Sequence, residues 1–174
     1  MTEQKTSFAS RLPFYLLVVV ILLYIGFPFA VFVLTRDVEQ GRKWVFLAIL
    51  ATFAVDTGAY ATGVLFGRHK LAPRISPNKT WEGAIGGYLS GAGAAFALNE
   101  AFDTGVPWTT LLHFALVFPV LAQAGDLFES WMKRRMGIKD SSGLLPGHGG
   151  LLDRLDSLMA VIPFLYLFLQ LRVL

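Results

Sequence analysis

Residues 12–34 read LPFYLLVVVILLYIGFPFAVFVL, a stretch without a charged side chain. A helix that crosses a bilayer needs about 20 consecutive, predominantly apolar residues, and this stretch is long enough. It follows Arg11, and no small-residue cleavage site separates it from a hydrophilic mature region. We therefore expect a retained first membrane span and not a cleaved signal peptide.

Further segments of the same apolar character follow, at residues 44–66, 81–102, 108–126 and 155–173. Hydrophobic residues make up 55% of the 174 positions, compared with roughly 45–50% in ordinary soluble domains. The sequence predicts an all-α, polytopic membrane helix bundle of about five transmembrane helices. We expect one membrane domain over residues 1–174, with a polar catalytic loop at residues 127–154.

Composition excludes several kinds of site. The chain has no cysteine, so disulfides, thiolate metal sites and cysteine nucleophiles are ruled out. The formal net charge of +3 is too small to indicate a nucleic-acid partner. No phosphate-binding loop of the Gly-x-x-x-x-Gly-Lys-Ser/Thr type, nucleophile elbow or His-Glu-x-x-His zinc motif occurs in the sequence.

Two basic connecting segments predict the orientation. Residues 67–80 carry four Lys or Arg residues and no acid, and residues 129–154 carry five. Two predicted spans separate these segments, so both lie on one side, and the positive-inside rule makes that side cytoplasmic. Residues 35–43 and 103–107 then lie outside.

Two carboxylates fall in or at the end of apolar segments. Asp56 lies within the second predicted span, where an ionised group is unfavourable by several kcal/mol without a partner, a cation or a water-filled cavity. It is interpreted either as a cavity-lining acid or as a protonated helix-contact residue. Asp126 shares one helix face with Gln123 and Ser130. The alternative for Asp126 is an acid solvated at the helix end.

The third predicted span has glycines at four-residue spacing, Gly83, Gly87 and Gly91. Small residues at this spacing allow helices to approach closely in lipid. We expect this face to pack tightly against another helix.

A polar segment at residues 130–156, SWMKRRMGIKDSSGLLPGHGGLLDRLD, combines basic side chains, three aspartates and a glycine-rich turn. If a helix begins after the glycines, Asp153 lies in its first turn, where a phosphate or a carboxylate is stabilised. Oxygen ligands without clustered His or Cys favour magnesium over zinc. Alternatively, Asp153 only stabilises its own helix, and His148 is either a structural hydrogen-bonding residue or a group that contacts phosphate.

The loop before the third span carries Ser76 and Pro77, which we interpret as a helix start, with serine as the cap and proline in the first turn. Lys79 lies at the membrane edge and is a candidate for function. The other basic residues of this loop, Arg68, Lys70 and Arg74, are expected to set topology or contact anionic lipid headgroups.

With these residues assembled, the chain resembles the phosphatidate cytidylyltransferase (CDP-diacylglycerol synthase) family. The matching C-terminal positions are Ser130, Lys133-Arg134, Lys139-Asp140, Ser142, Pro146, His148-Gly149-Gly150 and Asp153-Arg154-Leu155-Asp156. DTGAY at 56–60, GRHKLAPRISPNKTWEG at 67–83 and QAGDLFES at 123–130 also look like family segments. Bacterial members commonly carry further N-terminal spans, so the chain resembles a short form.

The resemblance implies roles for individual residues. Asp126 and Asp153 would hold Mg²⁺, with a second, monovalent cation considered beside it. The residues expected to bind phosphate or take part in catalysis are Lys133, Arg134, Lys139, His148, Gly149, Gly150 and Arg154. Ser76 and Lys79 would belong to a substrate-contacting loop, and Asp56 to a polar cavity.

The implied reaction joins CTP and phosphatidate to give CDP-diacylglycerol and pyrophosphate, in phospholipid biosynthesis. The expected setting is a bacterial inner membrane with the site facing the cytoplasm. The expected partners are these substrates and membrane lipids, not nucleic acid, and a second copy of the chain is also considered. A related lipid-phosphate nucleotidyltransferase, an ion-coupled carrier and an inactive scaffold remain as alternatives.

Overall fold

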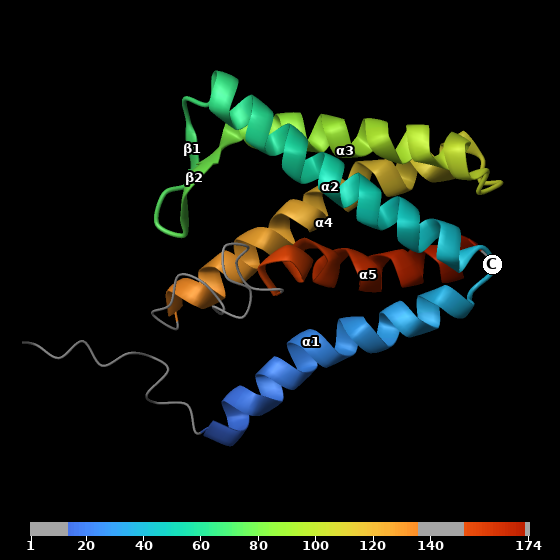
Figure 1. Cartoon of the computed structure of the whole chain (residues 1–174), viewed down its shortest axis with the longest axis horizontal. Helices are drawn as coiled ribbons and strands as arrows, with labels where there is room; N and C mark the ends of the chain where they lie inside the picture. Colours follow the sequence, from blue (N-terminus) through green and yellow to red (C-terminus); the bar gives the residue numbers. More distant parts are fainter. Residues whose placement is uncertain (1–13, 136–151, 173–174) are drawn as a thin grey trace, which may run out of the picture.

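The computed structural model describes residues 14–135 and 152–172, which form five helices and one small hairpin (Figure 1). The helices are α1 (Phe14–Asp37), α2 (Gly41–Phe66), α3 (Trp81–Phe102), α4 (Trp108–Arg135) and α5 (Leu152–Arg172). The strands are β1 (Lys70–Ala72) and β2 (Ser76–Thr80), paired antiparallel between α2 and α3. The predicted helical bundle is confirmed, and the hairpin was not predicted.

Each predicted apolar segment corresponds to one helix, but the fourth boundary was wrong. Residues 127–135, which we assigned to the polar loop, continue α4 to Arg135. In this extension Lys133 Nζ lies 2.9 Å from the Glu129 carboxylate one turn earlier. Such i,i+4 pairs stabilise a helix that is no longer apolar, which explains why α4 extends beyond its hydrophobic part.

The outer surface of the bundle is apolar, as expected for helices in lipid. By length and composition, α2 and α4 can cross a membrane, and α5 contains the shorter apolar stretch Ser157–Leu171. Large hydrophobic side chains are exposed on every helix, for example Phe29, Phe53, Leu89, Val120 and Leu167. Apolar exposure of this extent is unusual for a soluble protein and typical of a membrane surface.

An aromatic cluster joins α2, α4 and α5 in the interior. Trp44 and Phe114 meet edge to face with ring centroids 5.3 Å apart, and Phe114 stacks on Phe118 at 5.0 Å. Phe164 of α5 stacks on the same Phe114 ring. Because aromatic side chains bury large areas, this cluster holds the three helices in a common core.

Helices α2 and α3 pack closely at the hairpin end and separate toward the other end of the bundle (Figure 1). The glycine face of α3 makes this approach possible, and Gly83, Gly87 and Gly91 are all buried. A Cβ atom on Gly87 would lie 2.8 Å from the carbonyl oxygen of Val55. The close helix packing predicted from the glycine spacing is therefore confirmed.

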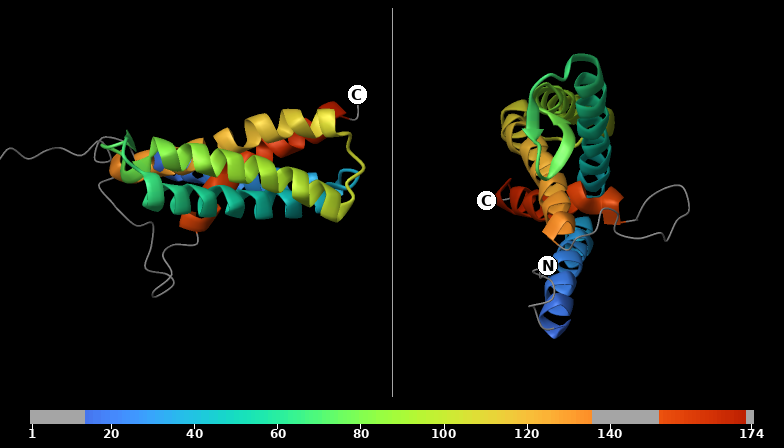
Figure 2. Two further views of the ribbon diagram at one scale, coloured as in Figure 1. Left: turned by 90° about the horizontal axis from the view of Figure 1, so that it is seen from above. Right: turned by 90° about the vertical axis from the view of Figure 1, so that its left-hand side faces the viewer.

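The connections that the structure describes lie at the two ends of the bundle (Figure 2). At one end, Arg134 Nε of α4 donates to the Ile75 carbonyl oxygen of the hairpin at 3.2 Å. At the other end, Lys43 Nζ after the α1–α2 turn donates to the Asp103 carbonyl oxygen between α3 and α4 at 2.6 Å. Basic residues 67–80 and the end of α4 thus share one side of the molecule.

Candidate active site

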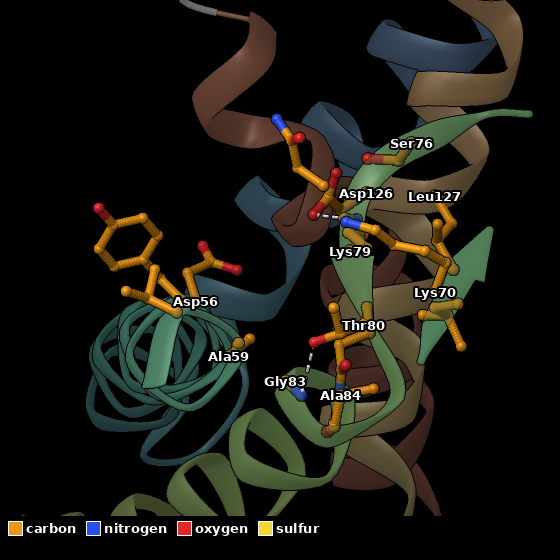
Figure 3. A pocket seen from close by; sticks show the side chains of 16 residues that line it. Asp56, Ala59, Lys70, Ser76, Lys79, Thr80, Gly83, Ala84, Asp126 and Leu127 are labelled. Carbon is orange, nitrogen blue, oxygen red and sulfur yellow. Dashed lines mark hydrogen bonds and ion pairs between the residues drawn. The ribbon is translucent and has the colours of Figure 1, made fainter. Parts of the chain in front are cut away.

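A cavity of about 560 Å³ lies at the hairpin end of the bundle (Figure 3). Its walls come from α2, both strands, the start of α3 and the middle of α4. The lining residues are Asp56, Ala59, Tyr60, Gly63, Val64, Lys70, Leu71, Ser76, Asn78, Lys79, Thr80, Gly83, Ala84, Gln123, Asp126 and Leu127. Four predicted site residues from three separate segments of the sequence, Asp56, Ser76, Lys79 and Asp126, therefore line one space.

The hairpin brings Ser76 and Lys79 to the cavity, and it corrects one interpretation. Ser76 begins β2 and does not cap a helix. The cap of α3 is Thr80, whose hydroxyl oxygen accepts a hydrogen bond from the Gly83 amide at 3.1 Å. Pro77 is tolerated in β2 because a strand of a two-stranded sheet has a free edge that needs no donor. α3 therefore begins at Trp81, after β2, and not at Ser76 as the Ser-Pro pair suggested.

Glu82, in the first turn of α3, anchors the other end of the hairpin. One carboxylate oxygen accepts from the backbone amides of Arg68 and His69 at 3.1 and 3.2 Å. The other oxygen lies 2.6 Å from His69 Nδ1. Because these contacts hold the chain where it leaves α2, Glu82 positions the hairpin, a role that the sequence analysis did not assign.

An ion pair crosses the cavity between Lys79 of β2 and Asp126 of α4 (Figure 3). The two side chains are 26% and 31% exposed, respectively. Both residues were predicted from the sequence to belong to the site, but in different roles and not as a pair. A lysine and an aspartate in contact within an open cavity form a centre that can bind groups of either charge.

Asp56 and Tyr60 line the cavity from α2. The Asp56 side chain is exposed and not enclosed between helices. On α4, Gln123 lies one turn before Asp126 and lines the same space. Its amide nitrogen donates to the carbonyl oxygens of Ala84 at 3.2 Å and Pro119 at 3.3 Å. Gln123 therefore ties α4 to α3 beside Asp126.

Two predicted phosphate-binding residues have other partners in the structure. Lys133 pairs with Glu129, whose side chain is 3% exposed. Arg134 holds the hairpin through Ile75. The sequence pattern identifies both as basic residues next to a membrane, but it does not show that Lys133 contacts a glutamate of the same helix or that Arg134 contacts a hairpin carbonyl.

α5 begins where a helix was predicted to start, directly before Asp153. The helix begins at Leu152, so Asp153 and Arg154 lie in its first turn. α5 also packs against α4, which carries Asp126. Lys139, His148, Gly149 and Gly150 fall outside the described residues. Among the residues whose side chains the structure describes, which do not include Asp153 and Asp156, no three or more acidic or histidine side chains form a group that could hold a metal.

Five polar residues of the cavity were not among the predicted site residues: Tyr60, Lys70, Asn78, Thr80 and Gln123. Lys70 was expected to set topology, yet it lines the cavity from β1. The signal that could have identified it is period-2 alternation in the hairpin, but strands of three and five residues are too short for this pattern to be clear.

Comparisons with known proteins show which family the chain is similar to. The model of the cytidylyltransferase family matches residues 2–172. Phosphatidate cytidylyltransferase of Bacillus subtilis (strain 168) is 43% identical over 150 residues, which cover 86% of this chain and 56% of the relative. Those of Staphylococcus epidermidis (strain ATCC 12228 / FDA PCI 1200) and Staphylococcus aureus (strain COL) are 44% identical over 146 residues, 84% of this chain and 55% of each relative.

The chain thus spans just over half the length of these curated relatives. A solved structure of an intramembrane enzyme for archaeal membrane lipids biosynthesis superposes with a TM-score of 0.54 at 21% identity, covering 71% of this chain and 75% of the other. This likeness supports the intramembrane helical fold. With a family model that matches nearly the whole sequence, the chain belongs to the cytidylyltransferase family.

Proposed function

We propose that this chain carries the active site of a phosphatidate cytidylyltransferase, which joins CTP and phosphatidate to give CDP-diacylglycerol and pyrophosphate. The observation that carries the proposal is the cavity beside the basic hairpin, in which Lys79 meets Asp126. The names of the relatives from Bacillus and Staphylococcus support the same reaction.

The cavity suits a phosphorylated lipid because it combines charge with apolar walls. Lys70 and Lys79 offer ammonium groups to phosphate oxygens, while Val64, Leu71 and Leu127 line the same space. A lipid phosphate needs both environments, with the acyl chains left in the bilayer. A soluble nucleotide reaches the polar side, which we propose faces the cytoplasm, in a bacterial inner membrane.

The reaction needs no protein nucleophile. A phosphate oxygen of phosphatidate attacks the α-phosphorus of CTP, a phosphorus–oxygen bond forms, and the bond to the pyrophosphate leaving group breaks. The contribution of the protein is then alignment and charge neutralisation. Lys70 and Lys79 would neutralise phosphate oxygens, and Thr80 and Glu82 would hold the hairpin that carries Lys79.

A magnesium ion would suit the carboxylate of Asp126, which lines the cavity, together with a second acid from the neighbouring helix. Asp126 presents a partly exposed carboxylate to it, and Asp153 lies in the first turn of the helix packed against α4. We propose that these two residues hold Mg²⁺, with phosphate oxygens of the substrate as further ligands. When bound, the ion would neutralise charge that develops on the phosphates. That a second, monovalent cation binds and that the chain forms a homodimer both remain predictions.

Turnover by the purified protein in lipid nanodiscs tests the proposal. With labelled CTP, phosphatidate and Mg²⁺, we expect a cytidine-linked lipid and pyrophosphate in equal amounts. Asp126→Asn and Asp153→Asn should each lower the rate on the order of 100-fold or more, because each removes a charged ligand. Asp103→Asn is the matched control, since Asp103 lies at the opposite end of the bundle and asparagine tolerates its left-handed backbone.

Normal turnover in Asp126→Asn would contradict the assignment of this residue. Absence of the lipid product from a folded protein would refute the proposed reaction. Nucleotide-independent solute flux in liposomes would then favour the ion-coupled carrier, and neither activity would favour the inactive scaffold. Products formed from other lipid phosphates in preference to phosphatidate would indicate the related nucleotidyltransferase.

A further inference from the structure

We infer that Lys79 exchanges its partner when a cation binds. Without the cation, Lys79 pairs with Asp126. When a cation binds to Asp126, the Lys79 side chain turns to a phosphate of the nucleotide. Cation binding and nucleotide binding would thus be linked through one side chain. The inference rests on the proposed function, because it takes Asp126 as a cation-binding residue.

The ion pair is built so that it can open. It joins residues of β2 and α4 that are far apart in the sequence, and both side chains are partly exposed within the cavity. Ion pairs that remain in contact with water are worth little, whereas fully buried pairs are costly to break. A competing ion can therefore displace the ammonium group of Lys79 at modest cost.

Lysine is suited to such an exchange. Its ammonium group sits on a flexible four-carbon stem, so the charge can move while the backbone stays in the strand. The strand itself is held at both ends, by Thr80 on α3 and by the Arg134 contact to Ile75. The motion is thus confined to the Lys79 side chain, which turns within a cavity already lined by Lys70.

A cation bound to Asp126 repels the Lys79 ammonium group and neutralises the carboxylate, so it weakens the contact between Lys79 and Asp126. Once displaced, Lys79 adds a second positive charge to the one that Lys70 brings to the cavity. A nucleotide triphosphate is attracted more strongly to that state. By thermodynamic reciprocity, the nucleotide then favours cation binding by the same factor.

Cation affinity without nucleotide is the first test. Binding of Mn²⁺ to the protein in nanodiscs is followed by electron paramagnetic resonance. Lys79→Met should tighten binding about threefold to tenfold, because the competing charge is gone. Arg74→Met is the matched control, since it removes the same charge from the exposed hairpin turn outside the cavity, and it should leave the affinity within about twofold of the wild-type value.

CTP affinity with and without Mg²⁺ is the second test, measured by equilibrium dialysis without phosphatidate. With Mg²⁺, Lys79→Met should weaken CTP binding by about tenfold, since a charged partner of the phosphates is lost. In EDTA, the loss caused by Lys79→Met should be several-fold smaller than with Mg²⁺, because Asp126 already neutralises Lys79 in the wild type and only the unpaired Asp126 carboxylate opposes CTP in the variant. Asp126→Asn should strengthen CTP binding in EDTA, since it releases Lys79.

Unchanged Mn²⁺ affinity in Lys79→Met, or an equal loss of CTP affinity with and without Mg²⁺, would overturn the inference. Lys79→Arg keeps the charge and should behave like the wild type in the Mn²⁺ titration, which separates charge from misfolding. The binding tests do not require turnover. A protein that forms product without this linkage would refute only the inference, and one that shows the linkage without product would refute only the proposed reaction.

Discussion

Gly87 is one of the glycines that allow α2 and α3 to approach closely. A Cβ atom on Gly87 would lie 2.8 Å from both the Val55 carbonyl oxygen and the Ala59 Cβ atom, so the helices would have to move apart. We expect Gly87→Ala to lower the free energy of unfolding by about 1–3 kcal/mol, the usual cost of overpacking. Thermal unfolding in detergent, followed by circular dichroism, measures the change.

Gly93→Ala is the matched control on the same helix. Nothing lies within 4 Å of the position that its Cβ atom would take. Alanine is the better helix former, so this variant should be as stable as the wild type or slightly more stable. Equal destabilisation of both variants would mean that the contact of residue 87 with α2 does not determine the effect.

At the scale of elements, the hairpin depends on the first turn of α3. Glu82 accepts two backbone amide hydrogen bonds from Arg68 and His69, and it carries the contact with the His69 ring. We expect Glu82→Ala to free this end of the hairpin, so that trypsin cleaves after Lys70 and Arg74, both exposed, several-fold faster. Mass spectrometry of the fragments over time measures the cleavage rate.

His69→Ala provides the comparison for that experiment. It removes the ring contact but leaves both backbone amides bonded to Glu82, so cleavage should stay near the wild-type rate. Equally fast cleavage in the two variants would place the anchor in the histidine ring and not in the backbone contacts.

The same hairpin shows where prediction from sequence fails at the scale of elements. The helices were predicted because apolar length is a local property of each segment. The hairpin was missed because its strands are short and its anchors, Glu82 and Arg134, come from α3 and from the distant end of α4. The end of α4 was missed for a related reason, since it is polar and is stabilised by the Glu129–Lys133 pair.

For the whole molecule, the two ends of the bundle should lie on opposite sides of the membrane. The chain has no cysteine, so single cysteines can be introduced without removing others. We expect a membrane-impermeant maleimide to label Arg74→Cys only in inside-out vesicles and Glu39→Cys only in right-side-out vesicles, because both positions are exposed in connections at opposite ends. Labelling of both from one side would contradict the proposed orientation.

The sequence alone determined the helical membrane architecture, the placement of both basic segments on one side, and the acids and lysines worth testing, because apolar length, charge and glycine spacing act locally along the chain. Only the tertiary structure decided which of these residues meet. In the structure Lys79 contacts Asp126, and Lys70 lines the cavity. Lys133 pairs with Glu129, and Arg134 donates to the Ile75 carbonyl oxygen. Such pairings depend on how distant segments pack, and packing is not encoded in any one segment.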